Sequence, residues 1–184
     1  TSPQLRVVRK DTEQAHICWG VKALDARHPD RFALAILDGV LGGGMASRLF
    51  QEIREKRGLA YAVYSYHALY QDTGEFVVYA GTRPDNATEV LRLIKQTVES
   101  LLSDGITADE LDRVREGIKG QMVLGLESTR GRMTRLGKSA VTGGELLSLD
   151  EIVERVDAVT IDSVNELART VFDGNHAVAM IAPI

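Results

Sequence analysis

Cysteine and long hydrophobic runs are both scarce in this sequence of 184 residues. The single cysteine, Cys18, excludes an intrachain disulfide, and its place in the apolar run Ile17–Trp19 predicts a buried, unreactive thiol. No apolar run approaches the roughly 20 residues that span a bilayer, and the first residues lack the apolar region of a signal peptide. We therefore expect no membrane partner and a cytoplasmic location.

An excess of one sign of charge is also lacking. The formal net charge is −4 at pH 7, from 22 Lys and Arg against 26 Asp and Glu. A general nucleic-acid binder needs a dominant basic face, which this composition does not supply. We expect no nucleic-acid partner.

The common catalytic motifs are missing as well. The four histidines, His16, His28, His67 and His176, are scattered, and no H-E-x-x-H or H-x-x-E-H occurs. No G-x-S-x-G marks a nucleophilic serine, and the acidic run 108–116 is typical of a solvated helix face. The sequence thus predicts that this chain binds no metal or other cofactor.

What the chain does have is a glycine run, Gly42, Gly43 and Gly44, at the end of a predicted helix. Phosphate-binding loops place their glycines after a strand, or precede a Lys-Ser/Thr pair, and this run does neither. Two interpretations remain: an interhelical turn that needs positive φ, or a place where another backbone, such as a peptide substrate, approaches closely.

The hydrophobic spacing predicts an α+β fold of one domain, residues 1–184, with a mostly antiparallel sheet and helices packed on one face. Capping boxes are predicted at Asn86/Glu89 and Thr107/Glu110, Ser47 is the predicted N-cap of the helix that follows the glycines, and Gly58 is its left-handed end. The expected strands cover 14–21, 60–70, 75–82 and 176–184. The expected helices cover 29–41, 47–57, one from Asn86, one from Thr107, then 130–142, 149–156 and 160–172.

Arg54 and Tyr61 are the remaining candidates for chemistry. A turn at Gly58 between helix and strand can bring the guanidinium and the phenol to one edge of the sheet. Both groups are hydrogen-bond donors, suited to holding an oxyanion. The alternative is structural, with Arg54 complementing the helix end and Tyr61 filling the sheet rim.

Residues 41–65, "LGGGMASRLFQEIREKRGLAYAVYS", resemble the C-terminal homologous half of the insulinase/pitrilysin zinc metallopeptidases, especially processing-peptidase-like members. The resemblance continues through "GTRPDNATEVL", "ITADELDRVREGIKGQMVLGLES" and "VTIDSVNELARTVF". It implies one half of a two-domain clamshell, with H-x-x-E-H and zinc on the N-terminal half. It also implies that Arg54 and Tyr61 anchor the peptide and stabilise the tetrahedral intermediate, and that Gly42 to Gly44 help to guide substrate.

The resemblance therefore predicts the substrate-binding half of a zinc-dependent metalloendopeptidase, inactive alone. Its expected partners are a peptide substrate and an N-terminal zinc-binding half, in the same chain or as a separate subunit. An isolated half is also expected to self-associate into a homodimer, because its cavity-facing surface would be exposed. The alternative is a non-catalytic scaffold of the same fold, and peptide specificity is left open.

Overall fold

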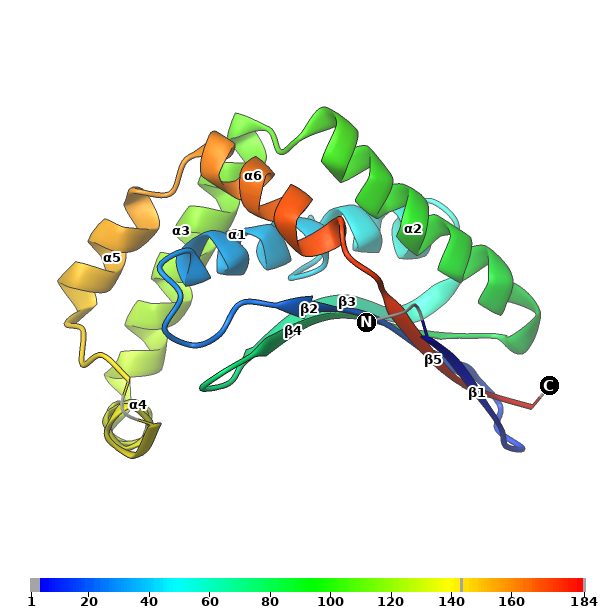
Figure 1. The fold of residues 1–184 in the computed structure, drawn as a ribbon, viewed down its shortest axis with the longest axis horizontal. Coiled ribbons are helices and arrows are strands. Elements are labelled where there is room, and N and C mark those ends of the chain that lie inside the picture. Colours follow the sequence, from blue (N-terminus) through cyan, green and yellow to red (C-terminus); the bar gives the residue numbers. More distant parts are fainter. Residues whose placement is uncertain (1–3, 143, 184) are drawn as a thin grey trace.

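The computed structural model describes residues 4–142 and 144–183, which form a five-stranded sheet with helices over one of its faces (Figure 1). The strands are β1 (Gln4–Arg9), β2 (Ala15–Ala23), β3 (Ala60–Leu69), β4 (Gly74–Thr82) and β5 (Ala177–Ala182). The α-helices are α1 (Arg31–Leu41), α2 (Ala87–Asp104), α3 (Ala108–Glu127), α4 (Thr129–Thr142), α5 (Leu149–Asp157) and α6 (Ile161–Phe172). A π-helical turn, η1 (Phe50–Glu55), and a 3₁₀ turn, η2 (Pro84–Asn86), complete the described elements.

The sheet order is β1-β5-β2-β4-β3, and only the β1–β5 pair is parallel. The predicted α+β class with a mostly antiparallel sheet is therefore confirmed. Strand β1 was not predicted, because all six of its residues are exposed and give little alternation of burial. The predicted last strand ends at Ala182, and Ile184 lies outside the described residues.

One apolar core lies between the sheet and helices α1, α2 and α6, which cover the same face in Figure 1. Alternate residues of β2, such as Ile17 and Trp19, point into it, as period-2 patterning predicts. The rings of Trp19 and Phe76 both contact Phe172 of α6, so the last helix packs directly on the central strands. Helices α4 and α5 lie beyond the β3–β4 hairpin, away from this core (Figure 1).

The helix ends show which of the predicted capping residues the structure confirms. Thr107 and Glu110 form the predicted capping box, and Gly58 has the predicted left-handed conformation, with φ of 62°. The predicted capping box at Asn86 and Glu89 is wrong. Asn86 already lies in the 3₁₀ turn η2 with a helical backbone conformation, and the Glu89 carboxylate pairs with Arg92 instead. Pro84 favours this 3₁₀ entry, since its fixed φ suits a first helical position.

Candidate functional site

The glycine run makes a tight turn against strand β3. The amides of Gly42 and Gly43 both donate to the Asp38 carbonyl at 2.9 Å, and the Ser65 amide donates to the Gly42 carbonyl at 3.4 Å. A Cβ on Gly42 would overlap the backbone nitrogen of Ser65. Close approach of two backbones is thus what requires Gly42. The alternative expectation of positive φ is wrong, because the only described glycines with positive φ are Gly58 and Gly105.

The carboxylate of Asp38, on α1, joins this turn to β3. Ser65 Oγ donates to Asp38 Oδ1 at 2.5 Å, and His67 Nδ1 lies 2.8 Å from Asp38 Oδ2. Sequence reasoning missed this cluster. The sequence pattern that could have indicated it is the i, i+2 spacing of Ser65 and His67, which places two polar side chains on the same face of a strand with no polar partner nearby in the sequence.

The segment after the turn departs from the predicted helix. It is helical from Arg48, but a hydrogen bond from Lys56 N to Gln51 O, at 3.0 Å, widens it into the π-helical turn η1. The hydroxyl of Ser47 donates to the Gly44 carbonyl at 2.5 Å, so Ser47 closes the glycine turn and does not act as the predicted side-chain cap. π-Helical turns such as η1 are frequent at functional sites.

A β-bulge places Tyr61. Ala60 pairs with Thr82 and Ala62 pairs with Gly81, so Tyr61 is an extra residue without a cross-strand partner. The bulge shifts the alternation of β3, so that Ala60 and Val63 stay in the core while Tyr61 points outward, 79% exposed. In an unbulged strand Tyr61 would share the inward face with Val63.

Arg54 and Tyr61 are brought together, as the sequence predicts. The Arg54 guanidinium carbon lies 4.5 Å from the centroid of the Tyr61 ring and 4.7 Å from that of Phe50, so both rings hold it by cation–π contact. Within the described part of the chain these ring contacts engage the guanidinium and the Tyr61 ring, and no hydrogen bond or ion pair joins the guanidinium or the Tyr61 hydroxyl to a neighbour. The pair therefore leaves its N–H and O–H donors available to a ligand.

The sheet face opposite the helices carries a group of tyrosines that the sequence reasoning did not single out. Tyr64 pairs in register with Tyr79, their ring centroids are 5.1 Å apart, and Tyr66 lies next to Tyr64. Burial raises the pKa of Tyr66 and Tyr79. Cys18 pairs with Tyr79 on this face and is half-buried, so the expected full burial of its thiol is wrong. Burial nevertheless raises the pKa of the thiol, which favours its unreactive form.

Beside the glycine turn, a cavity of about 500 Å³ opens between α1 and α3. Gly43 and Gly44 line it, with His67 from β3 and Arg113 from α3. Gly42 is buried and does not reach it. The exposed part of the predicted glycine site is thus Gly43 and Gly44.

The acidic run 108–116 is not simply a solvated face. Arg48 makes a two-pronged ion pair with Glu110, at 2.7 and 2.8 Å, and also donates to the Gly105 carbonyl at 2.7 Å. Burial would raise the pKa of Glu110, but the hydrogen bonds from Arg48 and Thr107 outweigh it and lower that pKa. This pair ties the segment before η1 to the start of α3.

The described residues contain no group of three or more His, Cys, Asp or Glu side chains that could hold a metal ion. No helix among them is long and apolar enough to cross a bilayer.

The sequence model of the peptidase M16 inactive domain matches residues 1–118. The chain belongs to this family. Relatives bear this out: an uncharacterized zinc protease of Bacillus subtilis, YmxG, is 45% identical over 95% of this chain and 43% of its own length. An uncharacterized zinc protease of Streptomyces coelicolor is 41% identical over 98% of this chain and 39% of its own length. This M16 chain therefore spans only about two fifths of the curated relatives that it matches.

Solved structures share the fold. A peptidase M16 inactive domain from Pseudomonas fluorescens superposes with a TM-score of 0.90 at 24% identity, covering 100% of this chain and 44% of that one. A protease from Helicobacter pylori superposes with a TM-score of 0.89 at 26% identity, covering 97% of this chain and 44% of that one. The predicted relationship to the inactive, C-terminal half of such peptidases is confirmed.

Proposed function

We propose that this chain is the substrate-binding half of a zinc-dependent metalloendopeptidase and supplies the Arg54/Tyr61 pair that holds the scissile peptide. The observation that carries the proposal is the stacked pair itself. Two consecutive irregularities, η1 and the bulge at Tyr61, bring a guanidinium and a phenol together with their donors unoccupied. π-Helical turns and β-bulges are both frequent at functional sites, where they change the direction in which a side chain points.

The chemistry of the pair fits a peptide carbonyl. As a carbonyl is attacked, its oxygen gains negative charge, and donors placed about 2.7–3.1 Å from the oxyanion stabilise that charge. Arg54 contributes a planar set of N–H donors and Tyr61 an O–H, while contacts with the Phe50 and Tyr61 rings hold the guanidinium in place. Gly43 and Gly44, exposed beside a cavity, would let the peptide backbone pass close by.

The described residues do not fit a zinc site, so the metal would lie on the other half, and no hydrolytic step is assigned to a metal on this chain. Curated relatives more than twice as long, named zinc proteases, support this division. The isolated chain is accordingly expected to be inactive. We place the assembled enzyme in the cytoplasm as part of the same proposal.

The test is Arg54→Ala in the complex reconstituted from both halves. We expect kcat to fall roughly 10²–10³-fold, as it does when an oxyanion donor is removed elsewhere. The matched control is Arg57→Ala, three residues on, whose cation is exposed and pairs with Glu52. Tyr61→Phe separates the two roles of the phenol, because it keeps the ring under Arg54 and removes only the O–H. Near-normal turnover of Arg54→Ala would refute the proposal and favour the non-catalytic scaffold.

A further inference from the structure

All five tyrosines of this chain lie on the β3–β4 hairpin. Four of them are at least 40% exposed, namely Tyr61, Tyr64, Tyr66 and Tyr70, whereas none of the four phenylalanines is exposed. Single exposed rings are ordinary on protein surfaces, but rings gathered on one element are typical of surfaces that bind a ligand or a partner. The distribution of the tyrosines therefore marks the outer face of this hairpin.

Three of the rings form a continuous array on the sheet face opposite the helices. The ring centroids of Tyr64 and Tyr79 are 5.1 Å apart, and those of Tyr64 and Tyr66 are 6.4 Å apart. On β2, the ring of His16 stacks on that of Tyr79, and its Nδ1 lies 2.8 Å from the Tyr79 hydroxyl oxygen. These contacts order the rings before any ligand arrives, which lowers the entropy that binding would cost.

Small side chains and an environment unfavourable to charge surround the rings. On the same sheet face, the strand register places Ala62 and Gly81 next to the Tyr64/Tyr79 pair, and Cys18 of β2 beside Tyr79. Burial raises the pKa of both the Cys18 thiol and the Tyr79 phenol, so the neutral forms are favoured here. The array therefore suits an uncharged ring better than an ion.

The array begins beside the Arg54/Tyr61 pair. Tyr64 is three residues from Tyr61 along β3, and Tyr66 is five residues from it. At about 3.3 Å per residue, these distances along the strand are about 10 and 17 Å. An extended peptide has the same rise per residue, so a carbonyl held at the pair would place a side chain three to five residues away over the rings.

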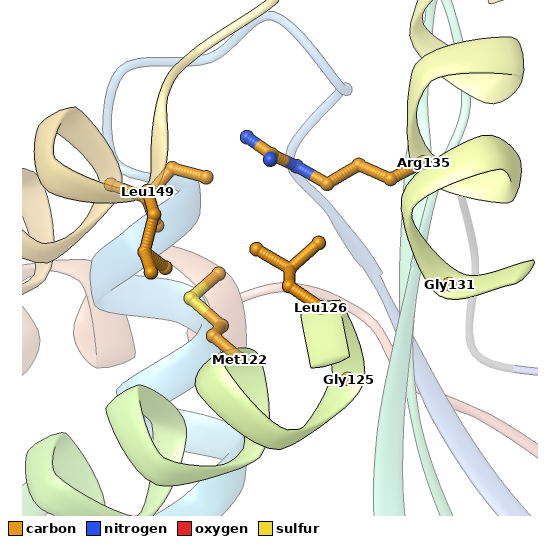
Figure 2. A pocket seen from close by; sticks show the side chains of 7 residues that line it. Met122, Gly125, Leu126, Gly131, Arg135 and Leu149 are labelled. Atoms are coloured by element: carbon orange, nitrogen blue, oxygen red, sulfur yellow. The ribbon is translucent and has the colours of Figure 1, made fainter. Parts of the chain in front are cut away.

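The apolar cavity of the helical layer has no such connection to the pair. It has a volume of about 220 Å³ and lies between α3, α4 and α5, where Met122 and Leu126 face Leu149 (Figure 2). Its lining includes no residue of η1 or β3. Of these two apolar surfaces, only the tyrosine array continues from the proposed peptide site.

We propose that the tyrosine array, defined by Tyr64, Tyr66 and Tyr79, is a subsite that selects an aromatic side chain of the peptide, three to five residues from the bond held at Arg54 and Tyr61. This inference rests on the proposed function. Tilted and offset rings contact one another favourably beyond the area that they bury, and the open edges of the array leave such positions to a ring of the peptide.

The test measures peptide binding by fluorescence anisotropy to the complex reconstituted from both halves, with a chelator present so that no peptide is cleaved. The labelled peptides are about ten residues long, enough to span β3, and consist of Ala, Ser and Gly with one varied position. A Phe at that position should bind roughly 3–10-fold more tightly than Ala, as aromatic pairs do elsewhere. Leu should fall between them, and Arg or Glu should bind no more tightly than Ala.

The double variant Tyr64→Thr/Tyr66→Thr should abolish the preference for Phe, because threonine suits a strand and removes the rings. Tyr64→Phe/Tyr66→Phe should keep it. The matched control is Val8→Thr on β1, at the opposite edge of the sheet and 44% exposed, which should leave the preference unchanged.

Equal binding of the Phe and Ala peptides by the wild type, or tightest binding of the Arg peptide, would overturn the inference without depending on the folding of any variant. So would a preference for Phe that the threonine variant retains. A homodimer of this chain, or an association of the halves, that the threonine variant abolishes in sedimentation velocity would assign the array to that contact instead. Arg54→Ala should lower kcat and keep the preference for Phe, so the catalytic proposal and this one fail separately.

Discussion

Substituting alanine at Gly42 tests the close contact on which the glycine turn depends. The added Cβ would meet the backbone nitrogen of Ser65 and, at 2.6 Å, its Oγ. The backbone nitrogen cannot rotate away as a flexible side chain can, because β3 is fixed by its ladder to β4. Either α1 must shift from β3, or the Ser65–Asp38 contact at 2.5 Å must break.

Overpacking of this kind costs about 1–3 kcal/mol, sometimes more. Alanine also reduces the conformational entropy of the unfolded chain, which stabilises the folded state by about 0.4–1 kcal/mol where the native φ suits alanine. Since the obstructing atom is a backbone nitrogen, which cannot rotate away, we expect the free energy of unfolding to fall by about 2–3 kcal/mol in total. At about 2–4 °C per kcal/mol for a chain of this size, Tm should fall by roughly 4–12 °C.

The assay is thermal unfolding followed by circular dichroism, with Gly44→Ala as the matched control. A Cβ on Gly44 meets nothing within 4 Å, and its φ is not in the left-handed region, so Gly44→Ala should be neutral or slightly stabilising. Adding Ser65→Ala to Gly42→Ala should not restore Tm, because the backbone nitrogen remains. Equal Tm values for Gly42→Ala and Gly44→Ala would refute the reasoning.

Two further predictions concern the Arg48–Glu110 pair. Arg48→Met removes a two-pronged, mostly buried pair and should lower the free energy of unfolding by about 2–3 kcal/mol, measured by urea unfolding. Arg92→Met, at the exposed pair with Glu89, should lower it clearly less, because solvent screens an exposed ion pair; equal losses would contradict this. The pKa of Glu110 is lowered by folding, so its contribution to stability is present above the unfolded pKa, near 4.3, and is lost as the pH falls through the folded value. The stability difference between wild type and Glu110→Gln should therefore shrink below about pH 4, and a difference that grows on acidification would show the opposite linkage.

Local signals predicted those parts of the fold whose causes are local. Thr107 and Glu110 cap α3 because the Thr107 hydroxyl accepts a hydrogen bond from the Glu110 backbone N–H and the Glu110 carboxylate accepts one from the Thr107 backbone N–H, both within four residues. Gly58 ends its helical segment for a similar reason, since only glycine enters the left-handed region without steric cost. The proximity of Arg54 and Tyr61 also followed from one short turn and from the family resemblance.

Hydrophobic periodicity, helix caps and a contiguous motif are all encoded within short stretches, so they were enough to predict the α+β class, most of the helices and the membership of a peptidase half. Tertiary structure decided what depends on residues far apart in the chain. Strand β1 exists only because β5 pairs with it, Gly42 is required only because β3 passes behind it, and Tyr61 faces outward only because β4 fixes the bulge. The exposure of Met133, Leu136 and Val141 on α4 was likewise decided by the packing, because the spacing of apolar residues does not say whether another element covers them.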